Sequence, residues 1–240
     1  MSEVARDKLL GQTAVGRNRV TPFMIATNYF PMLYLVLGGW LVITFGESIP
    51  RGLGLALVWI YLVPPVIGRI VLAIFGRPAG VVTPDARPYK IWWVLTQLQM
   101  PFNRIGLLEE ILRFVPGLYG LWLRLWGSTV SLLVYWAPGV MLTDRYLLRV
   151  GKGAVLGARC LIGGHLVTRD PDGNYVLTVA EVTIGDRAIV GANSAIGPGC
   201  EIRPDEVVPA GRYFGPFSGW KDGKRTAANR HSPDGRDAGG

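Results

Sequence analysis

The sequence has few of the residues that build metal centres and disulfide frameworks. It contains only 2 cysteines and 2 histidines among 240 residues. Two cysteines exclude a disulfide scaffold and a four-cysteine zinc site, and two histidines exclude a metal site of three histidines. We therefore expect no metal. Charged residues make up 18% of the chain and apolar residues 50%, which is too apolar for a disordered chain and too weakly charged for a typical soluble one.

Two long segments lack charge altogether. Residues 20–46 carry no charged side chain, and a second neutral run follows at 52–68. A bilayer core is crossed by about 20 apolar residues. We therefore predict a membrane region over residues 28–76, with one helix at 28–46 and one at 53–76. A buried helical hairpin in a soluble protein is the alternative.

Basic residues are distributed unevenly around these two helices. Four lysines and arginines precede the first helix and four follow the second, whereas Arg51 alone lies between the helices. Basic loops stay on the cytoplasmic side, so we expect residues 1–27, both chain ends and the rest of the protein in the cytoplasm, at the inner membrane. The net charge of +8 belongs to these membrane edges and to the C-terminal tail, which disfavours nucleic-acid binding. Pro64 and Pro65 are expected to kink the second helix.

Residues 77–125 mix apolar and charged side chains at helical spacing. We expect amphipathic helices on the membrane surface, with Trp92 and Trp93 at the level of the lipid headgroups. The same pattern also fits helices packed on the next domain. The neutral stretch 125–143 has the length of a third membrane helix, but its glycines, Pro138 and β-branched residues favour strands.

The C-terminal half contains a six-residue repeat. Large apolar residues recur at every sixth position in two blocks: Val150, Leu156 and Ile162, then Ile184, Val190, Ile196, Ile202 and Val208. A glycine follows six of them, and the fifth position of the repeat is small, which includes Cys160 and Cys200. This signature predicts a parallel β-helix over residues 126–218, with both cysteines inert in its interior.

The two blocks of repeats are out of phase. Ile162 and Ile184 are 22 residues apart, which is three repeats plus four residues. The turn signal around Asp172 predicts an inserted hairpin loop at about 166–181. Residues 219–240 are basic and rich in glycine and proline, so we predict a disordered tail, which would include His231.

The repeats resemble those of the left-handed β-helix, or hexapeptide-repeat, acyltransferases. Over about residues 105–218 the order of motifs is similar to that in membrane-associated acyltransferase-like domains at the C-terminal end of poly-amino-acid (poly-lysine type) synthetases. The matching motifs are Leu123-Arg124-Leu125-Trp126-Gly127, Leu142-Thr143-Asp144, Gly163-Gly164-His165 and Val182-Thr183-Ile184-Gly185. The resemblance implies a left-handed parallel β-helix that forms a homotrimer with active sites between subunits. Together with the membrane helical hairpin and amphipathic helices predicted above, this makes the chain an α+β membrane protein.

The resemblance also implies an activity. Such enzymes move an acyl group from a thioester of coenzyme A or of a carrier protein to an amine or a hydroxyl. Here the membrane region favours an amphiphilic, lipid-linked or natural-product acceptor. Two alternatives remain: a domain that forms amide (peptide) bonds from a carrier-bound aminoacyl thioester, with an acyl or peptidyl carrier protein as partner, and a trimeric membrane scaffold without catalytic activity.

The candidate catalytic residue is His165. Acyl transfer needs a base that takes a proton from the acceptor, and imidazole exchanges protons near neutral pH. A carboxylate would orient the ring, and we expect Asp144 first and Glu181 second. A surface histidine without a catalytic role is the alternative. The further candidates are Arg124, Arg145, Arg169 and Asp170 for the substrate and Lys152, Asn193 and Ser194 for coenzyme A, with a solvated or turn-forming role as the alternative for each.

Overall fold

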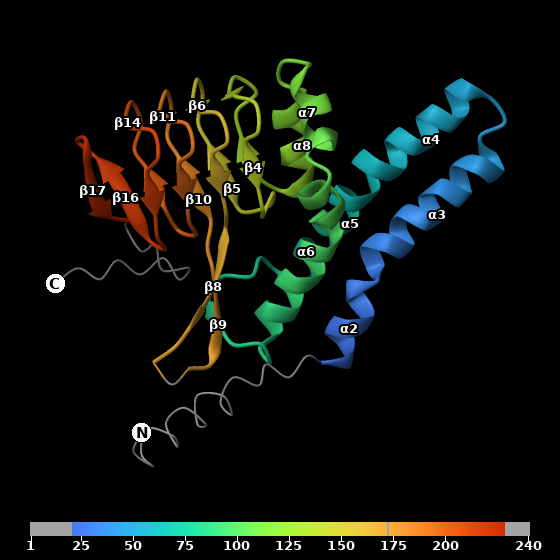
Figure 1. Cartoon of the computed structure of the whole chain (residues 1–240), viewed down its shortest axis with the longest axis horizontal. Helices are drawn as coiled ribbons and strands as arrows, with labels where there is room; N and C mark the ends of the chain where they lie inside the picture. Colours follow the sequence, from blue (N-terminus) through green and yellow to red (C-terminus); the bar gives the residue numbers. More distant parts are fainter. Residues whose placement is uncertain (1–20, 172, 229–240) are drawn as a thin grey trace, which may run out of the picture.

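The structure, a computed structural model, describes residues 21–171 and 173–228. Figure 1 shows a helical part that leads into a stack of β coils. The predicted segment 1–27 therefore lies mostly outside the described residues, as does His231. The helices are α2 (Pro22–Asn28), α3 (Phe30–Phe45), α4 (Ile49–Tyr61), α5 (Val63–Phe75), α6 (Arg87–Arg104), α7 (Leu107–Arg113) and α8 (Leu118–Trp126).

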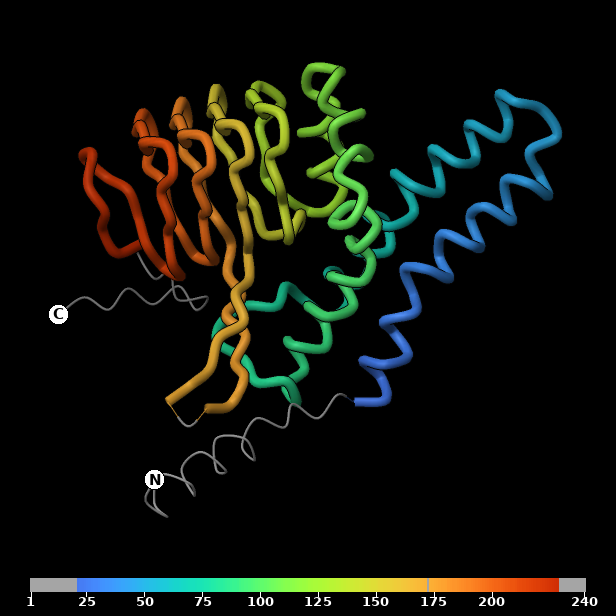
Figure 2. The backbone as a smooth tube through the Cα atoms, viewed as in Figure 1, coloured from blue at the N-terminus to red at the C-terminus, as the bar shows by residue number. Residues whose placement is uncertain are grey.

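Helices α2 to α5 form the predicted apolar hairpin. Two stretches, Pro22–Phe45 and Ile49–Phe75, are long and apolar enough to cross a membrane by length and composition. Most of their large apolar side chains are exposed. The second stretch is interrupted at Leu62, and α5 begins with the two prolines in its first turn, because proline cannot continue the hydrogen bonding of a helix interior. Figure 2 shows α3 and α4 running away from the rest of the molecule.

Helices α6 to α8 pack against the β coils. Trp92, Leu95 and Phe102 of α6 are each no more than 5% exposed and belong to one apolar core with the β-helix interior. The expectation that Trp92 lies among lipid headgroups is therefore wrong. Burying these side chains between two parts of the protein removes more apolar area from water than a headgroup region would.

The β part is a parallel β-helix with three sides. Its sheets have the strand orders β17-β16-β13-β10-β5-β2, β14-β11-β6-β3 and β15-β12-β7-β4. Strands on the same side lie one coil apart, as in the pairs Ile184↔Ile202 and Ile196↔Phe214. The strands are β2 (Thr129–Val130), β3 (Tyr135–Trp136), β4 (Met141–Leu142), β5 (Leu148–Val150), β6 (Val155–Leu156), β7 (Leu161–Ile162), β10 (Val182–Ile184), β11 (Ile189–Val190), β12 (Ala195–Ile196), β13 (Glu201–Ile202), β14 (Val207–Val208), β15 (Tyr213–Phe214), β16 (Ser218–Lys221) and β17 (Lys224–Ala227).

The repeat residues fill the interior of the coils as predicted. All eight are at most 3% exposed, and Cys160 and Cys200 are buried beside them. A coil of three six-residue sides fits the left-handed β-helix. The neutral stretch 125–143 forms the first coil through β2, β3 and β4, so it is not a third apolar helix.

The insert is a hairpin that leaves the stack of coils. It consists of β8 (His165–Arg169) and β9 (Tyr175–Val179), and residue 172 in its turn lies outside the described residues. A short strand after α5, β1 (Gly80–Val82), pairs with β9 and completes a three-stranded sheet. Figures 1 and 2 show this sheet beside the start of α6. The sheet thus ties the end of the apolar hairpin to the β-helix.

The predicted disordered tail is wrong for residues 219–227, and residues 229–240 lie outside the described part of the chain. Residues 218–227 form the antiparallel pair β16 and β17, which corrects the start of the tail at residue 219. Trp220 is 7% exposed, and its ring lies 5.8 Å from that of Phe214. This one aromatic side chain closes the last coil, although the polar composition around it resembles that of a disordered segment.

Candidate functional site

His165 lies at a corner of the β-helix. It is the first residue of β8 and follows β7 after only two glycines. Since β7 and the next coil strand, β10, belong to different sides, the hairpin is inserted where the chain turns from one side to the next. The coil holds the end of the hairpin that joins it. His165 therefore has a defined position, while the rest of the hairpin projects outward.

Asp144 lies directly against the imidazole. Its Oδ2 is 2.6 Å from Nδ1 of His165, and the hydroxyl of Thr143 donates a second hydrogen bond of 2.7 Å to the same oxygen. The carboxylate is fully buried, whereas the imidazole is 23% exposed. An ionised carboxylate can only accept, so Nδ1 carries the proton and Nε2 has a free lone pair. The arrangement is an oriented imidazole that can accept a proton from a bound group.

Gly164 allows this close approach. A Cβ on Gly164 would lie 2.8 Å from Cβ of Leu147 and 3.1 Å from Cβ of Asp144. Such distances are closer than van der Waals contact, so any larger residue would push the two segments apart. Its neighbour Gly163 donates its N–H to the carbonyl of Ile196 at 2.9 Å. That amide is already engaged, so it does not serve as an oxyanion donor.

Aromatic residues form the other wall of the site. The ring of Trp92 on α6 meets that of His165 edge-on, with centroids 4.8 Å apart. Tyr146 is fully buried, and its pKa is raised well above the ordinary value by burial and by the charge of Asp144. Within the described residues, Trp92 Nε1, Tyr146 Oη and Asp144 Oδ1 are buried without a hydrogen-bond partner. They are enclosed polar atoms, and Asp144 Oδ1 belongs to the same carboxylate that contacts the imidazole.

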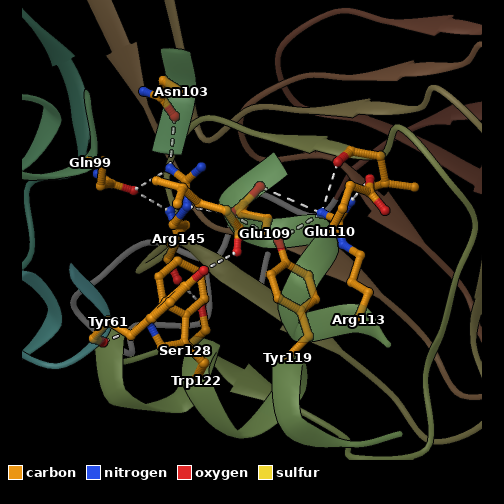
Figure 3. A network of polar contacts seen from close by, with 12 residues as sticks. Tyr61, Gln99, Asn103, Glu109, Glu110, Arg113, Tyr119, Trp122, Ser128 and Arg145 are labelled. Carbon is orange, nitrogen blue, oxygen red and sulfur yellow. Dashed lines mark hydrogen bonds and ion pairs between the residues drawn. The ribbon is translucent and has the colours of Figure 1, made fainter. Parts of the chain in front are cut away.

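Arg145, which we expected to bind substrate, is instead a buried structural residue. It is 1% exposed, and its Nε lies 2.6 Å from Glu109 Oε1. Its Nη1 donates to Asn103 at 2.7 Å, and Gln99 accepts from its backbone N–H at 2.7 Å. Figure 3 shows the guanidinium enclosed by these side chains from α6 and α7. Because Arg145 follows Asp144 in the chain, this network fixes the carboxylate of the site to the helical part.

The same network includes a second arginine. Arg113 pairs with Glu109 at 3.5 Å and with Glu110 at 2.6 Å, and it donates to the carbonyl of Val140 at 2.8 Å. Tyr119 donates to Glu109 at 3.1 Å, and burial followed by the charge of Glu109 raises the pKa of this phenol, so it stays protonated as a donor. Two guanidinium groups thus face two carboxylates, which leaves the buried network without net charge.

Glu181 does not reach the imidazole pair. Its two oxygens lie 3.2 Å from Nη1 of Arg77 and 3.0 Å from Nε of Arg149. Two residues before it, Val179 pairs with His165 across the hairpin. Glu181 is therefore a neighbour of the site that pairs with arginines. Of the two carboxylates expected beside His165, Asp144 is the one that contacts the ring.

The other substrate candidates lie at separate places. On the hairpin, Arg169 donates to the hydroxyl of Tyr175 at 3.1 Å, and Asp170 accepts from the backbone N–H of Asn174 at 2.8 Å. Asp170 thus shapes the hairpin turn. Arg124 lies on α8, and its Nε donates to the carbonyl of Val130 at 2.7 Å. None of these contacts involves His165.

The coenzyme candidates belong to the coils. The backbone N–H of Lys152 donates to Asp186 at 2.7 Å, and its side chain is exposed. Asn193 adopts φ 56° at a turn, and Ser194 is completely buried, where it accepts from the backbone N–H of Arg212 at 3.2 Å. Ser194 is therefore an interior residue, and the structure does not bring these three residues to the imidazole.

Sequence reasoning missed Thr143, Tyr146 and Trp92. Thr143 precedes the candidate carboxylate Asp144 directly and Tyr146 follows it by two residues, so their position in the chain was a usable signal. Trp92 is 73 positions from His165 in the chain, and no local pattern indicates that contact. A cavity of about 510 Å³ lies instead at the C-terminal end of the coils, lined by Tyr213, Phe214 and Trp220 among others.

No group of three or more histidine, cysteine, aspartate or glutamate side chains that could hold a metal occurs within residues 21–171 and 173–228. No protein-family model matches the chain, and no curated protein matches it. Among solved structures it is similar to a maltose O-acetyltransferase from Clostridium difficile 630. That similarity has 13% sequence identity and a TM-score of 0.38, and it covers 67% of this chain and 94% of the other. At this distance the function rests on the geometry of the site itself.

Proposed function

We propose that the protein is an acyltransferase of the hexapeptide-repeat type in which His165 is the general base. The observation that carries the proposal is the 2.6 Å contact between His165 Nδ1 and the fully buried Asp144 carboxylate. This contact orients the ring and stabilises its charged form. It leaves Nε2 to act on a substrate.

The reaction proposed has two proton transfers. The hydroxyl or amine of the acceptor attacks the carbonyl carbon of an acyl thioester while Nε2 of His165 takes its proton. The tetrahedral intermediate then collapses, the carbon–sulfur bond breaks, and the imidazolium returns the proton to the leaving thiolate. The products are an acyl ester or amide and a free thiol. Asp144 stays ionised and stabilises the imidazolium between the two steps.

The proposal includes a homotrimer, which the outer surface of the coils supports. The outward positions of two sides form in-register apolar rows, with Tyr135, Ile189 and Val207 on one side and Met141, Leu161 and Tyr213 on the other, each 39–62% exposed. A subunit in a ring presents two different faces to its neighbours. The strands β4 and β7 of the second row lead into the corner that holds Asp144 and His165, which suits an active site between subunits.

The proposal also places the α2–α5 hairpin in the cytoplasmic membrane. The exposed apolar side chains of these helices and the distribution of lysine and arginine support it. A Ser48→Cys variant at the tip between α3 and α4 tests sidedness, because both natural cysteines are buried. We expect an impermeant maleimide to label Cys at this position in intact cells. Labelling only after the membrane is opened would contradict a hairpin that spans the bilayer.

A transfer assay tests the activity. Purified full-length protein is incubated with radiolabelled acetyl-coenzyme A or long-chain acyl-coenzyme A and a membrane lipid extract. We expect label to appear in an extracted product together with stoichiometric free thiol. Absence of transfer from every thioester, including a carrier-bound one, would contradict catalysis and leave a membrane scaffold.

A further inference from the structure

Three arginines gather where the apolar hairpin ends. Arg69 lies on α5, Arg77 lies in the loop after α5, and Arg149 lies on β5. A single carboxylate, Glu181, pairs with two of them. Three guanidinium charges against one carboxylate leave the cluster with two uncompensated positive charges.

Arg69 has no ion-pair partner within residues 21–171 and 173–228. It lies inside the apolar stretch Ile49–Phe75, and among the described residues no carboxylate is within ion-pair distance of it. A charge within such a stretch is costly and marks a functional position in membrane proteins. Its side chain is exposed, so an external group can reach it.

The fold nevertheless holds two of these charges close together. A Cβ placed on Gly127 would lie 2.7 Å from Nη1 of Arg69 and 3.6 Å from Nη2 of Arg77. Gly127 ends α8 in the left-handed region at φ 106°, and its carbonyl accepts from Arg77. The glycine therefore leaves the space in which both guanidinium groups converge. Two like charges that converge on one residue repel each other, and an anion bound between them would offset that repulsion.

The cluster adjoins the imidazole pair. Glu181 follows Val179, the partner of His165 in the hairpin, by two residues. Arg149 follows Asp144 closely in the chain, and the buried Tyr146 lies between them. The charges of both Asp144 and Arg77 act on the pKa of Tyr146, in opposite directions. A molecule held at the arginines thus lies near enough to extend toward His165.

We propose that Arg69, Arg77 and Arg149 bind the phosphate of a phosphate-bearing lipid, whose tails lie along α5 and whose headgroup carries the acceptor to His165. Guanidinium groups bind phosphate through paired, charge-assisted hydrogen bonds. The origin of Arg69 on an apolar helix favours a lipid over a soluble phosphate. This inference rests on the proposed acyl transfer for the role of His165 and adds the substrate class.

The test measures binding without catalysis. Full-length protein in a neutral detergent is titrated calorimetrically with dihexanoyl phosphatidate, dihexanoylglycerol, inorganic phosphate and coenzyme A. We expect the phosphatidate to bind more tightly than the other three. In Arg69→Gln its affinity should fall at least about tenfold, as for the loss of one charge-assisted contact, while the melting temperature stays the same because Arg69 has no ion pair to lose.

Two matched variants complete the design. Arg51→Gln removes a charge at the other end of the same stretch, and it should keep the affinity for phosphatidate within about twofold. His165→Ala should also keep it, so a failure of acyl transfer and a failure of lipid binding are distinguishable. Equal affinity in Arg69→Gln and wild type would overturn the proposal. Inorganic phosphate or coenzyme A bound as tightly as phosphatidate would overturn it as well, by assigning the cluster to a free anion or to the donor.

Discussion

Asp144 and His165 are 21 positions apart in the chain, yet their side chains meet at 2.6 Å because one coil of the β-helix brings the two corners together. The carboxylate is buried and the imidazole is partly exposed. A buried charge needs a partner, and here Thr143 and His165 supply hydrogen bonds to the same oxygen. This contact orients the imidazole so that it can accept a proton from a bound group.

Asp144→Asn tests the carboxylate. The amide is similar in shape but carries no charge, so it no longer stabilises the imidazolium and can favour the wrong tautomer. We expect kcat to fall about 100-fold or more, with little change in KM. Steady-state release of free thiol measures both constants. Asp205→Asn is the control, because Asp205 pairs with Arg187 and both side chains are exposed. An equal loss in both variants would contradict the role of Asp144.

Gly164→Ala tests the close approach at the corner. The added methyl group would lie 2.8 Å from Leu147 and 3.1 Å from Asp144, so the two segments must separate. We expect a loss of about 1–3 kcal/mol in the free energy of unfolding, together with a loss of transfer. Gly106→Ala, where nothing lies within 4 Å of the new Cβ, should change neither. Full activity in Gly164→Ala would show that the site tolerates displacement of Asp144.

How much of this structure can be predicted from the sequence depends on how far apart the interacting residues lie in the chain. The coils were predictable, because each side must place one apolar residue inside at every sixth position, as Val190 and Ile196 do. The pairing of Asp144 with His165 followed from stacking of coils. The burial of Arg145 could not be predicted in this way. Its partner Glu109 is 36 positions away on α7, and the repeat pattern of the coils does not indicate which helix packs over them.

Glu109→Gln tests the buried network. The change leaves the charges of Arg145 and Arg113 without a shared carboxylate in a region that is nearly free of water. We expect a loss of about 3–5 kcal/mol of stability, seen as a large fall in the melting temperature. Asp205→Asn breaks an exposed pair instead and should leave the melting temperature unchanged. Similar melting temperatures for both variants would contradict a structural role for Glu109.

Burial raises the pKa of the thiols of Cys160 and Cys200. A raised pKa keeps the thiol protonated to higher pH than in the unfolded chain, and only the thiolate reacts with alkylating reagents. At about pH 8 we therefore expect no iodoacetamide adduct on the native protein and two adducts after denaturation, counted by intact-mass spectrometry. Rapid modification of the native protein would show that a cysteine is accessible and reactive.

If His165 is the general base of acyl transfer, added imidazole should restore part of the activity that His165→Ala removes. Thiol release and labelled product are followed for the wild type and the variant, each with and without added imidazole. We expect a loss of about 100-fold or more in the variant and partial recovery with imidazole, while the melting temperature and oligomeric state stay the same. Equal rates in the two proteins, or a loss that imidazole does not restore in any degree, would contradict it.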